Sequence, residues 1–328
     1  MKINIRNTFS CIALLSVMYS CKNNFPQDLD SFSLDMNFTQ TEYTPVVGRN
    51  TVFARNFNSG ESTLPLTFRI SSVRTFDGKE APELLKLFPV TTWKERYTGE
   101  EKSIEEIQAK RETMMRPLWE IGEHSGNLTM WSSSNSTILK TFPDSCYRFD
   151  IEVSSTGGRR YFKDLKLIPQ KEMAYEPFSE DGSAPFIYSL VGDSTQTSIA
   201  SNTIKVWFNR KGDGNALSFK FLDSKLNPIK LSKFATTDWD NLVHGFNKKF
   251  NADSTYLTYQ VEYPIPLVTS TKTKYVNSSG YAFTTFSFDR INSYGIRLPN
   301  FIGLPFRIYE KGDWEIVFYF SGEAPLFN

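Results

Sequence analysis

Histidine and cysteine are scarce in this chain. Its 328 residues include two histidines, His124 and His244, and three cysteines. The sequence has no HExxH, CxxC or GxxxxGK[ST] stretch, which excludes the commonest zinc, dithiol and phosphate-loop motifs. The stretch Gly122–Gly126 places His124 where a GxSxG nucleophile elbow needs serine. We therefore expect no metal, no cofactor and no catalytic residues.

A surplus of either charge is also missing. The chain has 37 Lys and Arg residues against 36 Asp and Glu, and the basic residues are scattered among the acidic ones. A nucleic-acid-binding surface needs a clustered basic footprint. We therefore expect no nucleic-acid partner.

Long apolar runs are absent beyond the N-terminus. The run Cys11–Met18 follows the basic residues Lys2 and Arg6, and a small residue, Ser20, precedes Cys21. This order is typical of an export signal, and the run is too short to span a bilayer.

The cysteine that ends this signal predicts a lipid anchor. We expect a lipoprotein signal peptide over residues 1–20, acylation of Cys21 and a tether over residues 21–30, so that the membrane is bound only through the anchor. Met18 and Tyr19 depart from a typical lipobox, so ordinary cleavage near the same site is the alternative.

The remaining cysteine has no predicted partner. Cys11 leaves with the signal, and acylation would occupy Cys21, so Cys146 cannot form an internal disulfide. It begins a stretch that alternates like a strand, and we expect an inert, at least partly buried thiol.

Short alternating stretches separated by Gly, Asn, Asp and Pro turns dominate the rest of the chain. This pattern predicts a mostly β protein with two Ig-like or jelly-roll-like sandwich domains in tandem. Their predicted bounds are residues 31–172 and 186–328. A linker without periodicity is expected over residues 173–185.

Three elements stand out within these domains. Tyr147–Val153 and Tyr161–Ile168 flank a Gly-Gly turn, and Phe306–Glu310 and Trp314–Phe320 flank Lys-Gly-Asp, so each pair predicts a hairpin. Residues 103–116 predict a helical insertion in the first domain, because Ser103 and Glu106 form a capping-box pattern and apolar residues follow at helical spacing.

The densest polar and aromatic stretch is Thr237–Phe246. Sugar recognition combines an aromatic ring with carboxylate or amide groups. The stretch offers these groups, and two further tryptophans are candidate sugar platforms, so the candidate ligand-binding residues are Asp238, Trp239, Asp240, His244, Trp93 and Trp131. The alternative is a capped helical turn in which Trp239 packs on the core, with the other two tryptophans also in the core.

Paired carboxylates would also suit glycoside hydrolysis. Asp238, Asp240 and Glu262 are the candidates for this reading. The sequence does not give their separation, so a glycosidase is kept as a third alternative.

Several stretches together resemble a family of Bacteroidota outer-membrane lipoproteins with an uncharacterised domain. The stretches are Pro89–Glu106, Phe149–Tyr161, Leu242–Phe246, Tyr263–Pro266 and Tyr309–Phe320. Such proteins are often encoded beside glycan uptake systems built on a TonB-dependent transporter.

The resemblance implies an outer-membrane protein that binds a glycan or glycopeptide as an accessory to nutrient uptake, without catalysis. The alternative is a structural or docking subunit of a TonB-dependent transporter complex. Lys22-Asn23-Asn24 follows the cysteine in place of an acidic export tag, so the membrane face is left open. Asp193-Ser194-Thr195 and Asp253-Ser254-Thr255 look like the O-glycosylation acceptor of that phylum.

Overall fold

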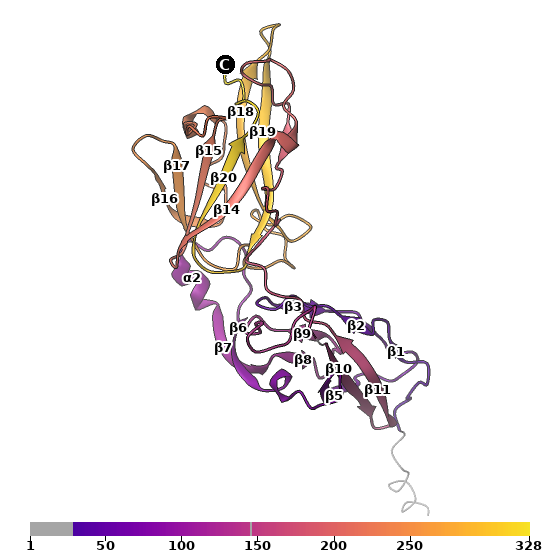
Figure 1. Cartoon of the computed structure of the whole chain (residues 1–328). Helices are drawn as coiled ribbons and strands as arrows, with labels where there is room; N and C mark the ends of the chain where they lie inside the picture. The colour runs from indigo at the N-terminus through magenta and orange to yellow at the C-terminus, as the bar shows by residue number, and fades with distance from the viewer. Residues whose placement is uncertain (1–28, 145) are drawn as a thin grey trace, which may run out of the picture.

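The structure, a computed structural model, describes residues 29–144 and 146–328. The predicted signal peptide and Cys21 lie outside these residues. Strands account for 44% of the described residues and helices for 5%, which confirms the mostly β class. Figure 1 shows two strand-rich units, which we call the N-terminal unit and the C-terminal unit, arranged end to end. The more specific prediction of two tandem sandwiches stays a prediction.

The N-terminal unit is built on a four-stranded sheet in the order β2-β11-β10-β5. A three-stranded sheet, β3-β9-β8, and a two-stranded one, β1-β4, complete it. The bounds are β1 Asn37–Phe38, β2 Glu42–Tyr43, β3 Thr51–Phe53, β4 Phe57–Asn58, β5 Thr67–Thr75, β8 Trp119–Ile121, β9 Leu128–Met130, β10 Tyr147–Ser155 and β11 Gly158–Leu167. A 3₁₀ turn, η2, covers Pro82–Leu84.

Large aromatic side chains form the centre of this unit. Tyr43, Trp119 and Phe149 are fully buried, with ring centroids 5.4 to 5.8 Å apart. The first predicted hairpin is confirmed, because β10 pairs antiparallel with β11. Its alternation is confirmed as well: the four inward residues, Tyr147, Phe149, Ile151 and Val153, are fully buried.

The helical prediction for residues 103–116 is correct only at its start. Helix α2 covers Ile104–Ala109, with the Ser103 hydroxyl accepting the Glu106 N–H at 3.2 Å as the predicted cap. From Arg111 to Pro117 the chain is strand β7, paired in antiparallel register with β6, Leu87–Trp93. Met114 and Met115 are exposed, so their helical spacing did not mark a core face.

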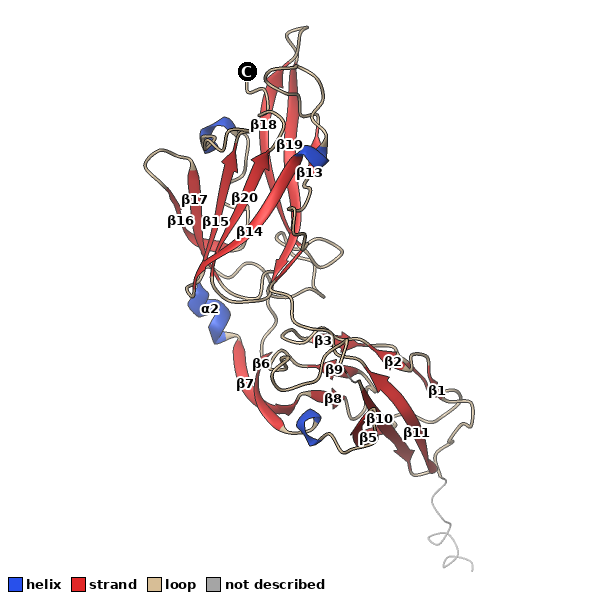
Figure 2. Cartoon of the chain, viewed as in Figure 1, coloured by secondary structure: helices blue, strands red, loops and turns tan. Residues whose placement is uncertain are grey.

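Strands β6 and β7 form an arm that leaves the N-terminal unit. They pair only with each other, and the connection at their tip, residues 94–110, carries α2. Figure 2 shows this tip lying against the base of the C-terminal unit. We call residues 87–117 the arm.

The C-terminal unit has two sheets around one core. One is β14-β20-β15-β17-β16, and the other is β12-β19-β13 with β18 also paired to β19. The bounds are β12 Tyr175–Glu176, β13 Phe186–Tyr188, β14 Ile204–Gly212, β15 Ala216–Leu222, β16 Gly245–Phe250, β17 Tyr256–Val261, β18 Ala282–Ile291, β19 Arg297–Ile308 and β20 Asp313–Phe320. Two 3₁₀ turns, η3 Ser201–Thr203 and η4 Leu231–Lys233, lie between strands.

The second predicted hairpin is wrong in its pairing. Strands β19 and β20 follow each other in the chain but lie in different sheets, and β20 pairs with β14 and β15 instead. The turn between them contacts the β14–β15 connection instead, because the Asp313 carboxylate accepts the N–H groups of Gly214 and Ala216 at 3.2 and 3.0 Å. The predicted inward face of β20, which carries Trp314 and Phe318, is buried as expected.

Part of the predicted linker belongs to this unit. Tyr175 and Glu176 pair with Ile308 and Arg307 of β19, and the Tyr175 ring stacks on Phe208 at 4.6 Å. No helix in residues 29–144 and 146–328 is long and apolar enough to cross a membrane.

Candidate functional site

A cleft with a volume of about 400 Å³ lies where the two units meet. The arm contributes Trp93 and Arg111, and the chain before β3 contributes Arg49 and neighbours. The C-terminal unit closes the other side. The lining residues are Gly48, Arg49, Asn50, Thr91, Trp93, Gln108, Arg111, Ser132, Glu262, Tyr263, Pro264, Pro266, Leu267, Thr269, Tyr309 and Lys311.

One wall of the cleft is a stack that joins the arm to the C-terminal unit. The guanidinium of Arg111 lies 4.7 Å from the Trp93 ring centroid. It donates to the Glu262 carboxylate at 2.9 Å and to the Tyr263 carbonyl at 3.2 Å. Burial lowers the pKa of Arg111, while the carboxylate of Glu262 opposes that effect and keeps the charged form.

A second part of the lining repeats this combination of arginine, aromatic ring and carboxylate. Arg49 lies 4.5 Å from the Tyr309 ring centroid and donates to Glu176 at 2.6 Å. Glu176 also accepts from Arg307 at 3.4 Å, and burial of this carboxyl, which would raise its pKa, is outweighed by the two guanidinium groups, so its pKa is lowered. In both places, an ion pair and an arginine stacked on an aromatic ring therefore form contacts around the junction between the two units.

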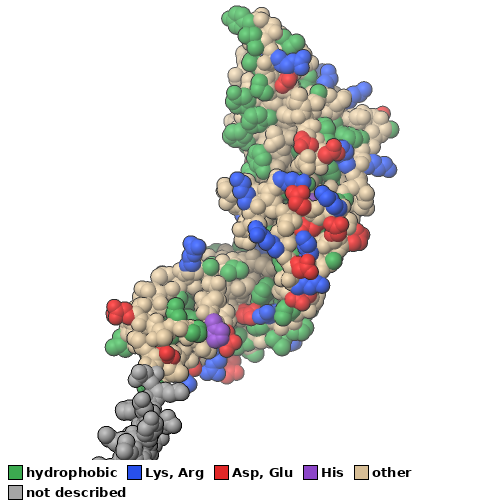
Figure 3. All heavy atoms as spheres, turned by 180° about the vertical axis from the view of Figure 1, so that it is seen from behind, with side chains coloured by type: hydrophobic (Ala, Val, Ile, Leu, Met, Phe, Trp, Pro, Cys, Tyr) green, Lys and Arg blue, Asp and Glu red, His purple; other side chains and the backbone are tan. Residues whose placement is uncertain are grey.

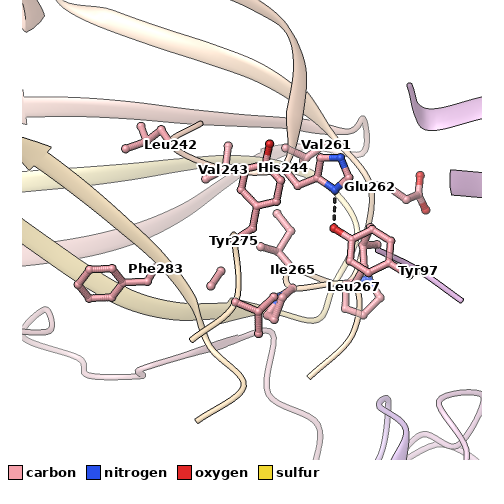
Figure 4. Close-up of a pocket in the computed structure, with 14 residues that line it drawn as sticks. Tyr97, Leu242, Val243, His244, Val261, Glu262, Ile265, Leu267, Tyr275 and Phe283 are labelled. Atoms are coloured by element: carbon pink, nitrogen blue, oxygen red, sulfur yellow. Dashed lines mark hydrogen bonds between the residues drawn. The ribbon is translucent and has the colours of Figure 1, made fainter. Parts of the chain in front are cut away.

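A second contact, at the arm tip, holds His244 of the C-terminal unit. Its Nδ1 is hydrogen-bonded to the Tyr97 hydroxyl, and its Nε2 lies 2.9 Å from the Glu101 carbonyl oxygen. Figure 4 shows the Tyr97 and His244 side chains pointing toward each other. The imidazole also stacks on Tyr275, with ring centroids 4.7 Å apart and planes inclined by 4°.

These contacts assign the proton of His244. A carbonyl oxygen only accepts, so Nε2 carries the hydrogen and Nδ1 accepts from the tyrosine. Burial is the largest influence on this imidazole and lowers its pKa, which favours the same neutral form. The adjoining cavity is about 20 Å³, room for a single water molecule.

Glu101 organises the arm tip from within. Its carboxylate accepts the N–H groups of Thr98 and Gly99 at 3.0 and 2.9 Å and pairs with Lys110. Burial would raise its pKa, but the hydrogen bonds from Lys110 and Thr98 outweigh it and lower the pKa to about 2. This loop therefore presents a fixed shape to the C-terminal unit.

The structure separates the predicted ligand-binding residues. Trp93 lines the cleft and His244 lines the small cavity at the arm tip, so these two belong to the junction between units. Asp238, Trp239, Asp240 and Trp131 line neither cavity. The predicted set is thus not one constellation.

Trp239 packs on the core of the C-terminal unit, as in the alternative considered from sequence. Its ring lies 5.7 Å from Phe250 and 5.9 Å from Phe286, and Tyr259 donates to its carbonyl oxygen. The stretch forms turns rather than a helix, with the Asp238 carboxylate accepting the Asn241 N–H at 3.2 Å.

The other predicted residues are also engaged in local contacts. Trp131 is half-buried and donates to the Glu120 carboxylate at 2.7 Å, and Asp240 pairs with Lys248 on the surface. Of the three carboxylates considered for glycoside hydrolysis, only Glu262 lines the cleft, where Arg111 pairs with it. Cys146 is a free thiol of intermediate burial.

The cleft is equipped for binding through aromatic faces and hydrogen bonds. Trp93 and Tyr309 supply rings, and Asn50, Gln108 and Ser132 supply amide and hydroxyl groups. Among the described residues, no three His, Cys, Asp or Glu side chains are grouped to hold a metal ion. Figure 3 shows basic and acidic side chains interspersed near the junction on the opposite face of the molecule.

Sequence reasoning missed most of this cleft. Arg49, Arg111, Tyr309 and Lys311 were not singled out, because they are far apart in the chain and carry no local motif. The available signal was indirect: Tyr309 and Lys311 fall in one of the stretches that carry the family resemblance, and Glu262 immediately precedes another.

Comparison with known families bears on both units. A family model described as a domain of unknown function (DUF5007) matches residues 57–328, a span that includes the arm and the whole C-terminal unit. Comparison with curated proteins gave no match. Since the model covers most of its length, the chain belongs to the DUF5007 family.

Proposed function

We propose that this protein is a non-enzymatic lipoprotein of the outer membrane, anchored through Cys21, that captures a glycan or glycopeptide for nutrient uptake. In this proposal two β-sandwich units hold the ligand in the cleft between them. The observation that carries the proposal is the cleft itself, in which Trp93 lies among amide, hydroxyl and charged side chains.

The size and lining of the cleft support a saccharide ligand. Its volume of about 400 Å³ lies within the range of roughly 300 to 1,000 Å³ typical of ligand pockets. A sugar ring offers an apolar face to an aromatic ring and hydroxyls to amides and carboxylates. The pairing of each cleft arginine with a carboxylate and an aromatic ring keeps the walls in place before a ligand binds.

A glycan array followed by isothermal titration calorimetry on soluble protein of residues 23–328 tests the proposal. We expect Trp93→Ala to abolish binding and Gln108→Ala to weaken it several-fold, since Gln108 is exposed and lines the cleft. Trp239→Ala is the matched control, because this tryptophan lies outside the cleft. Thermal unfolding of each variant separates lost binding from lost folding.

The outcomes distinguish the alternatives. Binding that survives Trp93→Ala but not Trp239→Ala would move the site to the Thr237–Phe246 stretch. Turnover of a bound glycan would instead favour the glycosidase. No binding to any glycan would overturn the proposal.

A second candidate function is docking to a TonB-dependent transporter. The outer face of β13, β18 and β19 exposes Phe186, Tyr188 and Phe283 by 59%, 52% and 38%, and Phe301 stacks against the first two. Figure 3 shows hydrophobic side chains along the side of the C-terminal unit that carries β13 in Figure 2. Exposed apolar patches of this kind mark protein interaction sites. Co-purification with a transporter that is lost in Phe186→Ser/Tyr188→Ser, with glycan binding unchanged, would support it.

A further inference from the structure

The charged side chains that line the cleft are unequal in sign. Arg49, Arg111 and Lys311 are basic, whereas Glu262 is the acidic lining residue. A whole-chain balance of 37 basic to 36 acidic residues does not predict such a local surplus. The surplus of basic side chains is therefore a local property of the cleft lining.

Contacts with neighbouring residues do not cancel this surplus. Glu262 is occupied by Arg111, at 2.9 Å. Glu176 forms ion pairs with two guanidinium groups, those of Arg49 at 2.6 Å and Arg307 at 3.4 Å. With Lys311, these ion pairs comprise four basic groups and two carboxylates.

Lys311 is the cation with the least compensation. It is exposed in the turn before β20, and none of the described carboxylates lies within 4 Å of its Nζ. The turn itself is held by Arg210, whose Nη2 donates to the Lys311 carbonyl oxygen at 3.1 Å. The backbone of Lys311 is therefore held in place, while its ammonium group is free to bind a ligand.

Arg49 keeps unused donors as well. Of its five N–H groups, the described contacts use one at Nη1, for Glu176, while the stack on Tyr309 holds the plane of the guanidinium. A planar guanidinium with free N–H groups matches a carboxylate or sulfate.

We propose that the ligand of this cleft is an anionic saccharide, whose carboxylate or sulfate is bound by Lys311 and Arg49 while a sugar ring lies against Trp93. This inference rests on the proposed glycan-binding function and specifies its substrate class. The net positive cleft also attracts such a ligand from a distance, and salt weakens that attraction.

Oligosaccharide pairs of equal length and linkage test the inference by calorimetry: galacturonan with its carboxyl-reduced form, mannuronan with its carboxyl-reduced form, and a sulfated galactan with its desulfated form. We expect the anionic member of at least one pair to bind tenfold or more tightly than the neutral member. Its affinity should fall as NaCl rises from 50 to 500 mM, because the Debye screening length is about 10 Å at 0.1 M and shortens as salt is added. Equal affinity within every pair that binds would overturn the inference and leave the proposed function standing.

The variant Lys311→Gln provides a second test of the inference. It should weaken the anionic ligand about tenfold or more, as expected for a charged hydrogen bond, and leave the neutral member of the pair unchanged. Lys249→Gln on β16 is the control, because this lysine is exposed outside the cleft. An equal loss in both variants, or no loss in Lys311→Gln, would contradict the inference, and failure of every saccharide to bind would overturn the inference together with the proposed function.

Discussion

His244 illustrates how single residues connect the two units. Its imidazole belongs to the C-terminal unit, but both ring nitrogens bond to the arm tip, through Tyr97 and the Glu101 carbonyl. The neutral form satisfies both contacts at once. Protonation would place a second N–H on Nδ1, the atom that accepts the hydrogen of the Tyr97 hydroxyl in the neutral form.

This arrangement predicts a pH-dependent stability. The folded pKa of His244 is lowered by burial, so between that pKa and the unfolded value of about 6.5 the unfolded chain binds the extra proton. Stability contributed by the neutral imidazole is therefore complete at higher pH and falls as pH drops below about 6.5, by at most about 1.4 kcal/mol per pH unit. Urea unfolding between pH 7.5 and 5.5 measures the slope.

The matched variants identify the residue responsible. His244→Gln should flatten the slope, whereas His124→Gln should preserve it, because His124 is exposed in a turn of the N-terminal unit. A slope that survives in His244→Gln would assign it to another group.

Glu101 gives a second prediction at this scale. Glu101→Gln removes the charge that pairs with Lys110 and orders the N–H groups of Thr98 and Gly99. We expect a loss of about 2 to 3 kcal/mol, since the group is buried and charged. Glu100→Gln is the control and should change stability little, because Glu100 is exposed and lies 3.5 Å from Lys274. Equal effects of the two variants, measured by thermal unfolding, would contradict a special role for Glu101.

At the scale of elements, the arm joins the two units. Its tip must approach the loop that carries Thr273 closely, and Gly99 makes this possible. Gly99 has a φ of +82°, and a Cβ at this position would lie 3.0 Å from the Thr273 Cβ.

Gly99→Ala should therefore both strain the backbone and push the arm tip away. Gly78→Ala is the matched variant, because Gly78 has a φ of +88° and nothing within 4 Å of its missing Cβ. We expect Gly78→Ala to cost about 1 kcal/mol from the left-handed conformation alone, and Gly99→Ala to cost more. Hydrogen exchange at residues 97–103 should rise only in Gly99→Ala. Similar exchange in both variants would mean that the tip does not depend on this close approach.

The arm also shows where sequence reasoning failed. Met114, Met115 and Leu118 fit a helix because short apolar spacings fit helices and strands alike. The deciding contact, pairing of β7 with β6, is made with residues 18 to 30 positions earlier and has no local signal. Helix α2 was predicted correctly at its cap, because Ser103 and Glu106 act locally.

In the C-terminal unit, too, the features that depend on local sequence were predicted and those that depend on distant contacts were not. The inward face of β20 was predicted from its alternation, since facing residues follow a period of two within one strand. Its partners were not, because adjacency of β14, β20 and β15 depends on the packing of the whole unit. The candidate site followed the same rule: Trp93, which lines the cleft, was singled out by its residue type, whereas Arg49, Arg111 and Lys311 required the folded arrangement.

At the scale of the molecule, the buried pair of Arg111 and Glu262 connects the two units. Their side chains are 9% and 13% exposed, so removing one partner leaves a charge that solvent reaches poorly. Glu262→Gln should destabilise the protein by about 3 to 5 kcal/mol. Replacing both residues by methionine should recover most of that loss, because a buried ion pair is often no more stable than well-packed apolar side chains.

Differential scanning calorimetry checks this prediction. We expect one cooperative transition in the unaltered protein and an earlier, broader or split transition in Glu262→Gln. A Glu262→Gln protein as stable as the unaltered one would show that the pair does not connect the units energetically.

The described chain begins at the end of the N-terminal unit that is remote from the C-terminal unit. Asp30 is bonded to Thr156 at the β10–β11 turn, with its carboxylate 2.6 Å from the Thr156 hydroxyl, and in Figure 1 this turn lies at the end of the N-terminal unit remote from the C-terminal unit. The short stretch from Cys21 to this point reaches on the order of 30 Å at full extension, at roughly 3.3 to 3.6 Å per residue. Under the proposed acylation of Cys21, the lipid headgroups would therefore lie within about 30 Å of the end of the molecule that is remote from the cleft.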